Sequence, residues 1–346
     1  MHTIIKQDVG DILRIMGNEI YKLEGKNILV TGAAGMLPSY LVYTIIEANK
    51  TIFKKPCNLY LILRKKTRKF GNEKHIHYKY CDVAKSKPIF KEDFHFIIHA
   101  ASKAAPKLYV MNMLDTLNTN IKGLYYVLDL VTAKTESMLY FSSGEVYGEP
   151  ENIKSITENY IGRVDHLNKR SCYIEGKRAC ETILMNYFWE KQYPIKIARI
   201  FHTFGPGLNL EDGRVFSDFI RNGWENKDVE IKGDKNIVRP ILYIKDATIM
   251  FFKILFSDKN GEVYNVGNEK NTISVGELAN ITCQVSNEIF KHNNKVKIKK
   301  QNIKYYSYAL KEIHIDISKF INTLNYKPDT MIKEAIKRTF LSLLVE

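Results

Sequence analysis

The sequence predicts an α/β fold built on a doubly wound parallel sheet, with a smaller lobe toward the C-terminus. Three observations predict it. Short apolar runs of strand length alternate with helix-length segments between residues 27 and 200, the first run leads into a glycine turn, and the alternation breaks up beyond residue 203. Strands that alternate with helices form right-handed βαβ units, and their parallel sheet is covered by helices on both faces.

The expected elements follow in chain order. Val9, Ile12, Leu13, Met16 and Ile20 recur at helical spacing and predict an amphipathic helix before the first strand. Helices are also expected in the segments 117–132, 173–190 and 329–345. Runs rich in apolar and β-branched residues predict strands, and they cover 27–30, 58–63, 77–83, 94–102, 137–143, 194–200 and, later in the chain, 261–268.

The composition is that of an ordinary soluble protein, with 45% apolar and 26% charged residues in a chain of 346. No stretch of 18 apolar residues occurs, and the N-terminus lacks the apolar core of a signal peptide, so a cytoplasmic protein without a membrane partner is expected. The five cysteines are an odd number without a C-x-x-C pair or metal-ligand spacing. They predict reduced thiols and no metal site.

A net charge of +14 raises the question of nucleic acid, because basic proteins gain affinity by releasing counterions from phosphates. The basic residues are spread thinly, however, and the densest runs, "LRKKTRKF" and "HNNKVKIKKQNIK", contain no nucleic-acid motif. Such runs are more often solvated faces. A small anion such as a nucleotide diphosphate is therefore the expected partner, and nucleic acid is not.

The segment "NILVTGAAGMLP" carries the first chemical motif. Gly32 and Gly35 follow a strand and open a helix, so the amides there, including those of Met36 and Leu37, can approach a pyrophosphate where the helix dipole favours an anion. The spacing is G-x-x-G, and Pro38 stands at the third glycine position. Glycines also serve plain strand-to-helix turns, but this context predicts a Rossmann-type dinucleotide site.

Three regions follow from this reading. Residues 1–24 are expected to form a helical extension, and residues 25–202 a dinucleotide-binding domain to which the chain returns near 239–268. Residues 203–346 are expected to form mainly the smaller, substrate-binding lobe.

The end of the second strand normally reads the cofactor ribose, with an acid for NAD and a basic residue for NADP. Here Arg64 follows the strand and no acid is present, which favours NADP on residue chemistry alone. Arg64 could equally stack over the adenine or point to solvent. Asp82 could accept a hydrogen bond from the adenine amino group or simply cap a turn.

Tyr173 and Lys177 are one helical turn apart and share a face of the predicted helix. A nearby ammonium, or the positive ring of an oxidised nicotinamide, stabilises phenolate and is expected to lower the pKa of the tyrosine toward neutrality. Tyr173 would then be a general base for an alcohol, and Ser143 at the end of the adjacent strand would hold the same alcohol by a hydrogen bond. The order of glycine turn, serine, tyrosine and lysine makes this pattern specific.

With these residues in place, the chain between about residues 26 and 335 resembles the extended short-chain dehydrogenase/reductase family of nucleotide-sugar epimerases, dehydratases and decarboxylases. The likeness rests on motifs that include "TGAAGMLP", "FIIHAAS", "SSGEVYG", "YIEGK", "ARIFHTFGPG" and "RPILYIKDA". It implies a nucleoside-diphosphate sugar as substrate and a homodimer formed through the helices at 117–132 and 173–190.

The resemblance also implies residue roles. The cofactor residues it adds are Val83, Ala100, Ala101, Ser102 and Asn120. The substrate residues it implies are Lys103, Gly144, His202, Arg214 and Arg239, of which Arg239 stands where the family places a diphosphate-binding arginine. His202 replaces the family's usual asparagine.

Within the family the chain is most similar to the UDP-glucuronate decarboxylases, whose "EVYG" pattern matches Glu145 to Gly148. Members of this kind begin by oxidising carbon 4 of the sugar. A 4,6-dehydratase then uses an Asp-Glu pair, but the aspartate position here is Gly144. A decarboxylase needs no such acid, because a 4-keto-uronic acid is a β-keto acid that loses carbon dioxide, and Glu145 could shape the ring or help deliver a proton to carbon 5.

Other interpretations remain open at this point. The enzyme could release a 4-keto sugar as a 4-dehydrogenase, with Glu145 as a bystander, or act as an epimerase or dehydratase. Glu145 could also be a loop cap. A non-catalytic dinucleotide-binding sensor is the alternative outside enzymes. If the sugar is oxidised and then reduced again in one visit, the cofactor stays tightly bound. The resemblance favours NAD, and Arg64 keeps NADP open.

Overall fold

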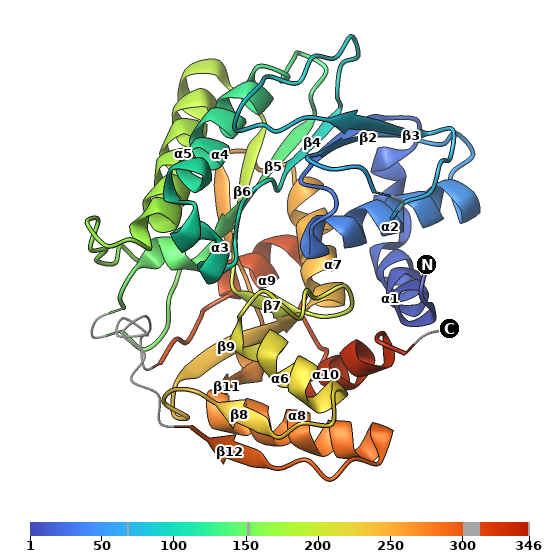
Figure 1. The fold of residues 1–346 in the computed structure, drawn as a ribbon. Helices are drawn as coiled ribbons and strands as arrows, with labels where there is room; N and C mark the ends of the chain where they lie inside the picture. The colour runs from blue at the N-terminus through green and yellow to red at the C-terminus, as the bar shows by residue number, and fades with distance from the viewer. Residues whose placement is uncertain (68, 151–152, 300–311, 345–346) are drawn as a thin grey trace.

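A seven-stranded parallel sheet forms the centre of the computed structural model (Figure 1), which describes residues 1–67, 69–150, 153–299 and 312–344. The strand order is β3-β2-β1-β4-β5-β6-β10, and every pairing is parallel. This order confirms the doubly wound α/β fold. The strands are β1 Asn27–Thr31, β2 Asn58–Leu63, β3 Ile76–Tyr80, β4 Phe96–His99, β5 Ser137–Ser143, β6 Ile195–Ile200 and β10 Glu262–Val266.

Two of the predicted strands end three residues early, and each ends where a side chain hydrogen-bonds to the backbone. The run 77–83 leaves the sheet after Tyr80, and Asp82 then accepts a hydrogen bond from the amide of Ala84. The run 94–102 leaves it after His99, where the amides of Ala100 and Ala101 donate to the side-chain hydroxyl of Thr31 at the end of β1 rather than to a backbone carbonyl.

Helices cover both faces of this sheet (Figure 1). On one face lie α1 Thr3–Met16, α2 Met36–Thr51 and α7 Ile244–Leu255, and on the other α4 Met113–Leu128 and α5 Ser171–Lys191. Side chains of β1 alternate between the two faces of the sheet, because successive residues of a strand point to opposite faces. Ile28 and Val30 belong to the core under α2 and α7, whereas Leu29 belongs to the core under α4 and α5.

The predicted helices exist with shifted ends. The helix expected around residues 9–20 begins at Thr3, and the chain then continues from Gly17 as a 3₁₀ helix to Leu23. The segment 117–132 corresponds to α4, which starts earlier and is preceded by the short α3, Pro106–Met111. The expected 329–345 helix is α10, Ile332–Leu341, and residue 345 lies outside the described residues.

The C-terminal lobe contains strands that the sequence pattern did not predict. β7 His202–Phe204, β9 Val238–Tyr243 and β11 Thr272–Ser274 form one sheet, and β8 Val229–Ile231 pairs with β12 Val296–Ile298. Four of these five strands have only three residues, too few to show an alternation. The helices of this lobe are α6 Val215–Trp224, α8 Val275–Phe290, α9 Ser318–Leu324 and α10.

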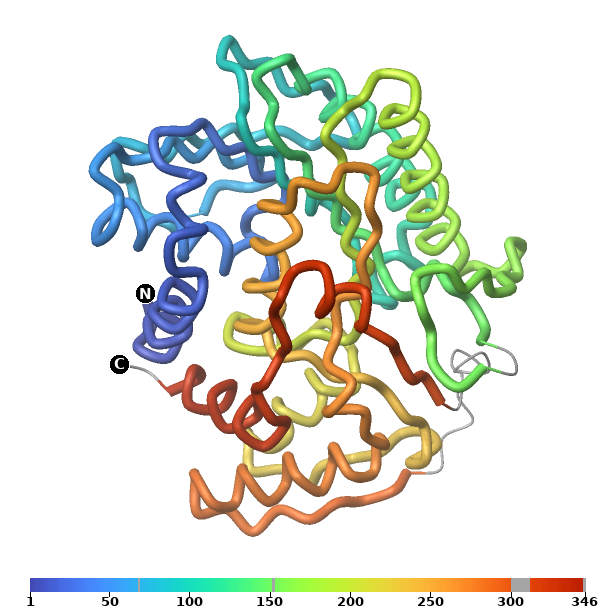
Figure 2. The backbone as a smooth tube through the Cα atoms, turned by 180° about the vertical axis from the view of Figure 1, so that it is seen from behind, coloured from blue at the N-terminus to red at the C-terminus, as the bar shows by residue number. Residues whose placement is uncertain are grey.

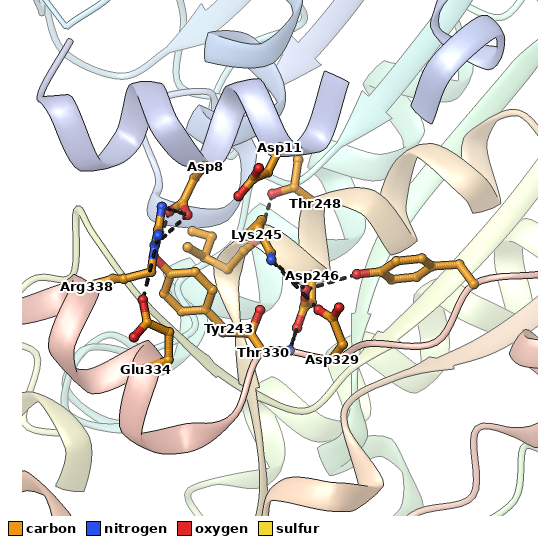
Figure 3. Close-up of polar contacts among 12 residues, drawn as sticks. Asp8, Asp11, Tyr243, Lys245, Asp246, Thr248, Asp329, Thr330, Glu334 and Arg338 are labelled. Atoms are coloured by element: carbon orange, nitrogen blue, oxygen red, sulfur yellow. Dashed lines mark hydrogen bonds and ion pairs between the residues drawn. The ribbon is translucent and has the colours of Figure 1, made fainter. Parts of the chain in front are cut away.

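The N-terminal helix ties the two ends of the chain together. A ring nitrogen of His2 lies 3.0 Å from the carbonyl of Leu344, and Figure 2 shows these two ends of the described chain close to each other. Asp8 of α1 is fully buried and accepts hydrogen bonds from the hydroxyls of Tyr40 on α2 (3.0 Å) and Tyr243 at the end of β9 (2.6 Å). The guanidinium of Arg338 on α10 lies 2.8 Å from the same carboxylate (Figure 3). The buried carboxylate of Asp8 therefore links helix α2 to the C-terminal lobe.

Three further features bear on the sequence predictions. No helix in the described parts of the chain is long and apolar enough to span a membrane. The same residues contain no group of three or more histidine, cysteine or acidic side chains arranged for a metal ion. All five cysteines are free, and Cys57, Cys180 and Cys283 are buried, as expected for reduced thiols.

Candidate active site

The glycine turn joins β1 to α2 at the carboxyl edge of the sheet. Gly32 has a φ of +66°, and a Cβ there would lie 2.9 Å from the Cα of Ala101, so only glycine lets the two chain segments approach. Gly35 is the N-cap of α2, and no side chain caps that helix. The amides of Met36 and Leu37 in its first turn are thus placed to bind an anion.

The segment after β4 is held beside this turn. Thr31 hydrogen-bonds through its hydroxyl to the ring of His99 (2.8 Å) as well as to the two following amides. Ser102 donates to Oδ1 of Asn120 on α4 (2.8 Å). The Asn120 amide nitrogen is buried and has no hydrogen-bond partner among the described residues. The nitrogen faces Gly176 of α5, where an added Cβ would lie 3.0 Å from it.

The residues expected around the adenosine lie nearby. Val83 is buried, and a Cβ on Gly123 of α4 would come within 3.0 Å of it. Asp82 uses one oxygen to cap the turn at residue 84, which is the simpler of its two expected roles.

Arg64 is exposed at the end of β2, and its charge helps to lower the pKa of Asp115. The larger cause of that lowered pKa is a hydrogen bond from Lys103, so Lys103 is engaged with Asp115 on α4.

Lys69 is a residue at this edge that the sequence analysis missed. Its amine donates to the carbonyl of Ala34, within the glycine turn, at 3.2 Å. Burial lowers its pKa to about 8. The only sequence signal was its place in the basic run 63–70, which was interpreted as a solvated face.

Tyr173, Lys177 and Ser143 meet above the end of β5. Tyr173 and Lys177 lie on α5 and are buried, and the amine of Lys177 donates to the carbonyl of Phe141 at 2.6 Å while lying 5.9 Å from the centre of the Tyr173 ring. Ser143 is the last residue of β5, and its hydroxyl acts as a hydrogen-bond partner that favours the phenolate of Tyr173. The three residues expected to act together therefore do lie together.

The expected lowering of the tyrosine pKa is not produced by the protein's own groups. Burial raises the pKa of Tyr173 well above its ordinary value, the carboxylate of Glu145 raises it further, and only Ser143 and Arg214 oppose them. Lys177 does not offset this burial, because its amine is bonded to the main chain and burial lowers its own pKa to about 8. The lowering of the Tyr173 pKa expected from the positive ring of an oxidised nicotinamide stays a prediction.

Glu145 follows β5 in the short 3₁₀ helix Gly144–Tyr147 and has two partners that the sequence analysis did not name. Arg170, at the start of α5, places its guanidinium 3.3 Å from the Glu145 carboxylate. Tyr109 of α3 reaches the same carboxylate with its hydroxyl at 3.5 Å, and its ring stacks on that of Tyr173 at 4.9 Å. Glu145 is therefore not a simple loop cap.

Gly144 has no room for a side chain. A Cβ at this position would lie 2.8 Å from two ring carbons of Phe201, closer than real Cβ contacts approach. Phe201 is itself buried and packs against Tyr147. An acidic residue cannot stand beside Glu145 here without displacing that ring.

The substrate-side arginines surround His202. Arg214 binds Asp212 through its Nε at 2.6 Å, and Arg239 donates to the carbonyl of Val238 at 2.7 Å. Burial lowers the pKa of Arg239 to about 10. Burial, followed by the charges of Arg239, Arg214 and Arg170, lowers the pKa of His202 to about 3, so its ring is neutral at physiological pH.

We expect the neutral state of His202 to make the protein sensitive to acid. The ordinary histidine pKa is 6.5, so the unfolded chain takes up a proton at a higher pH than the folded protein. The contribution of this site to stability is complete above pH 6.5 and is lost as the pH falls toward 3, by about 1.4 kcal/mol for each unit. A His202→Asn variant should show a flatter pH dependence of urea unfolding over that range, and an unchanged slope would contradict the assignment.

Comparisons with known proteins agree with this arrangement. Residues 28–267 match the model of the NAD dependent epimerase/dehydratase family. UDP-glucuronic acid decarboxylase 6 of Arabidopsis thaliana is 30% identical over 309 residues, which cover 89% of this chain and 86% of that protein. UDP-glucuronic acid decarboxylase 1 of Xenopus tropicalis is 31% identical over 243 residues, covering 70% of this chain and 56% of that protein.

Solved structures share the fold. An epimerase from Methanothermobacter thermautotrophicus superimposes with a TM-score of 0.82 at 21% identity and covers 96% of both chains. UDP-glucuronic acid 4-epimerase from Bacillus cereus, solved with UDP-glucuronic acid and NAD, gives a TM-score of 0.75 at 21% identity and covers 92% of this chain and all of that one.

Proposed function

We propose that this chain, which belongs to the NAD dependent epimerase/dehydratase family, oxidises a nucleoside-diphosphate glucuronate at carbon 4 and then decarboxylates it. Sequence relatives named UDP-glucuronic acid decarboxylases, matched over most of the chain, support the substrate class. The observation that carries the reaction type is Gly144, whose neighbour Phe201 leaves no space for the acid that a dehydratase would need.

The cofactor edge fits a dinucleotide. Gly32 and Gly35 leave the turn open for a pyrophosphate, and the uncapped first turn of α2 offers the amides of Met36 and Leu37 to it. Bound NAD supplies the hydride acceptor at carbon 4 and a positive charge that favours the phenolate form of a nearby tyrosine. NAD is the expected cofactor. Arg64 is exposed at the end of β2, and NADP stays open on residue chemistry.

Tyr173 accepts the proton of the carbon 4 hydroxyl as hydride leaves that carbon, and Ser143 holds the same oxygen. Lys177 contributes a positive charge next to Tyr173. The bond between carbons 5 and 6 then breaks, carbon dioxide leaves, and its electron pair moves to the oxygen on carbon 4, where the Tyr173 hydroxyl donates its proton. Glu145 would pass a proton from solvent to carbon 5, and the hydride would return to carbon 4 from a bound reduced nicotinamide, so that the product is a pentose whose carbon 4 oxygen keeps the proton from Tyr173.

A panel of UDP-, GDP-, dTDP- and CDP-linked sugars, with products identified by mass, tests this function. Loss of carbon dioxide from UDP-glucuronate is the expected result. Loss of water from a neutral hexose would instead show a dehydratase, loss of two hydrogens a 4-dehydrogenase, and an unchanged mass with altered stereochemistry an epimerase. A protein that binds NAD and converts none of the sugars would favour the sensor alternative.

We also propose that two copies pair through α4 and α5, which lie side by side (Figure 1). Leu114, Leu117, Ile121 and Tyr125 recur on α4 at helical spacing, and Leu114 is 79% exposed although it is apolar. Light scattering should report a dimer, and Leu114→Glu should shift it to monomer. Ile89→Glu, an equally exposed position outside these helices, should leave the dimer intact, and a monomeric unaltered protein would refute the pairing.

A further inference from the structure

Three guanidinium groups converge on the substrate side of the site with fewer carboxylates to balance them. Arg170, Arg214 and Arg239 all act on the buried ring of His202. Arg214 is paired with Asp212 at 2.5 Å, so Glu145 is the acid left to balance the other two. Arg170 and Arg239 are close enough for their charges to repel. Such a cluster favours an additional anion.

Arg170 has the hydrogen-bonding capacity to bind that anion. A guanidinium has five N–H donors, and Arg170 uses a terminal nitrogen for Glu145 and also hydrogen-bonds to the side chain of Tyr109. Its Nε is buried without a hydrogen-bond partner among the described residues.

The position of Arg170 places the anion at the reacting end of the sugar. Tyr173 follows it by three residues at the start of α5, and the ring of Tyr109 stacks on Tyr173 while its hydroxyl contacts Glu145. Arg239 extends from β9 in the C-terminal lobe and comes near Arg170 and Glu145 from that side. A nucleoside-diphosphate uronate carries two anionic groups, a diphosphate and a carboxylate on the sugar, and the carboxylate is the one next to the reacting carbons.

We propose that Arg170 is the residue that selects a uronate, by donating from Nε and a terminal nitrogen to the carboxylate of the sugar while a second terminal nitrogen keeps its contact with Glu145. This inference rests on the proposed function, because it assumes that the sugar sits over Tyr173. The planar guanidinium can donate to both oxygens of a carboxylate at once. A neutral hydroxymethyl group cannot accept this pair of hydrogen bonds. Arg170 therefore discriminates between a uronate and a neutral hexose on the same nucleotide.

Calorimetric binding of UDP-glucuronate and UDP-glucose tests the inference, in a Tyr173→Phe background that prevents turnover. Arg170→Gln should weaken the binding of UDP-glucuronate about 10- to 100-fold, the usual effect of losing charge-assisted hydrogen bonds. The affinity for UDP-glucose should stay within about twofold of its original value. Arg170→Lys keeps the charge but loses the fork, so an intermediate loss is expected. It also serves as the test if the glutamine variant does not fold.

The matched control is Arg178→Gln on the same helix, whose side chain is paired with Glu175 at 3.3 Å and is one-third exposed. It should leave both affinities unchanged. Equal weakening of the two sugars by Arg170→Gln, or of neither, overturns the role of Arg170. If Tyr173-containing protein releases no carbon dioxide from UDP-glucuronate, the proposed function fails instead, and the two failures are read from separate measurements.

Discussion

A Tyr173→Phe variant is expected to bind the cofactor and the sugar nucleotide but to lose turnover by about a hundred- to ten-thousand-fold, the usual contribution of a positioned general acid or base. The substitution removes only the hydroxyl. The ring remains stacked on Tyr109, so the buried packing at 4.9 Å is preserved. Release of carbon dioxide from UDP-glucuronate and single-turnover absorbance of the reduced cofactor both measure the loss.

Tyr187→Phe provides the matched control, because Tyr187 lies on the same helix and packs against Tyr193. Its turnover should equal that of the unaltered protein. Full activity in Tyr173→Phe would show that another group handles the proton of carbon 4. A rise in KM with an unchanged kcat would show that Tyr173 binds the substrate without acting on it.

An Asp8→Ala variant is expected to lose about 3–5 kcal/mol of unfolding free energy, as is usual when one partner of a buried ion pair is removed. Burial raises the pKa of Asp8, so the pair itself is a modest source of stability. The cost arises because Arg338 remains largely buried without its acceptor and the hydroxyls of Tyr40 and Tyr243 lose theirs. Urea unfolding followed by circular dichroism measures it.

Asp11→Ala is the control on the same helix. Asp11 bonds to Arg14, whose side chain is 73% exposed, and such pairs contribute at most about 1 kcal/mol. A second variant separates charge from packing: adding Arg338→Met to Asp8→Ala removes the uncompensated cation and should recover part of the loss. Equal losses in Asp8→Ala and Asp11→Ala, or no recovery in the double variant, would mean that this network is not what holds α1 in place.

The local sequence pattern was sufficient to predict those elements whose structure depends on residues close together in the sequence. The six strands predicted before residue 203 are short runs rich in apolar, aromatic and β-branched residues, as is typical of strands, and all six occur in the central sheet. The glycine turn was recognisable because Gly32 needs a positive φ at a close approach to Ala101. Tyr173 and Lys177 were recognisable because helical spacing puts them on one face. The short strands of the C-terminal lobe escaped detection because three residues carry no periodicity.

The sequence by itself determined the doubly wound fold, the place of the cofactor turn and the order of serine, tyrosine and lysine, since each depends on residues within one or two turns of the chain. Only the tertiary structure decided what surrounds them. Arg170 reaches Glu145 across 25 positions and Arg338 reaches Asp8 across 330. Burial, which no local pattern reports, raises the pKa of Tyr173 and keeps His202 neutral. Charges act through space, so their partners and their desolvation exist only after the chain has folded.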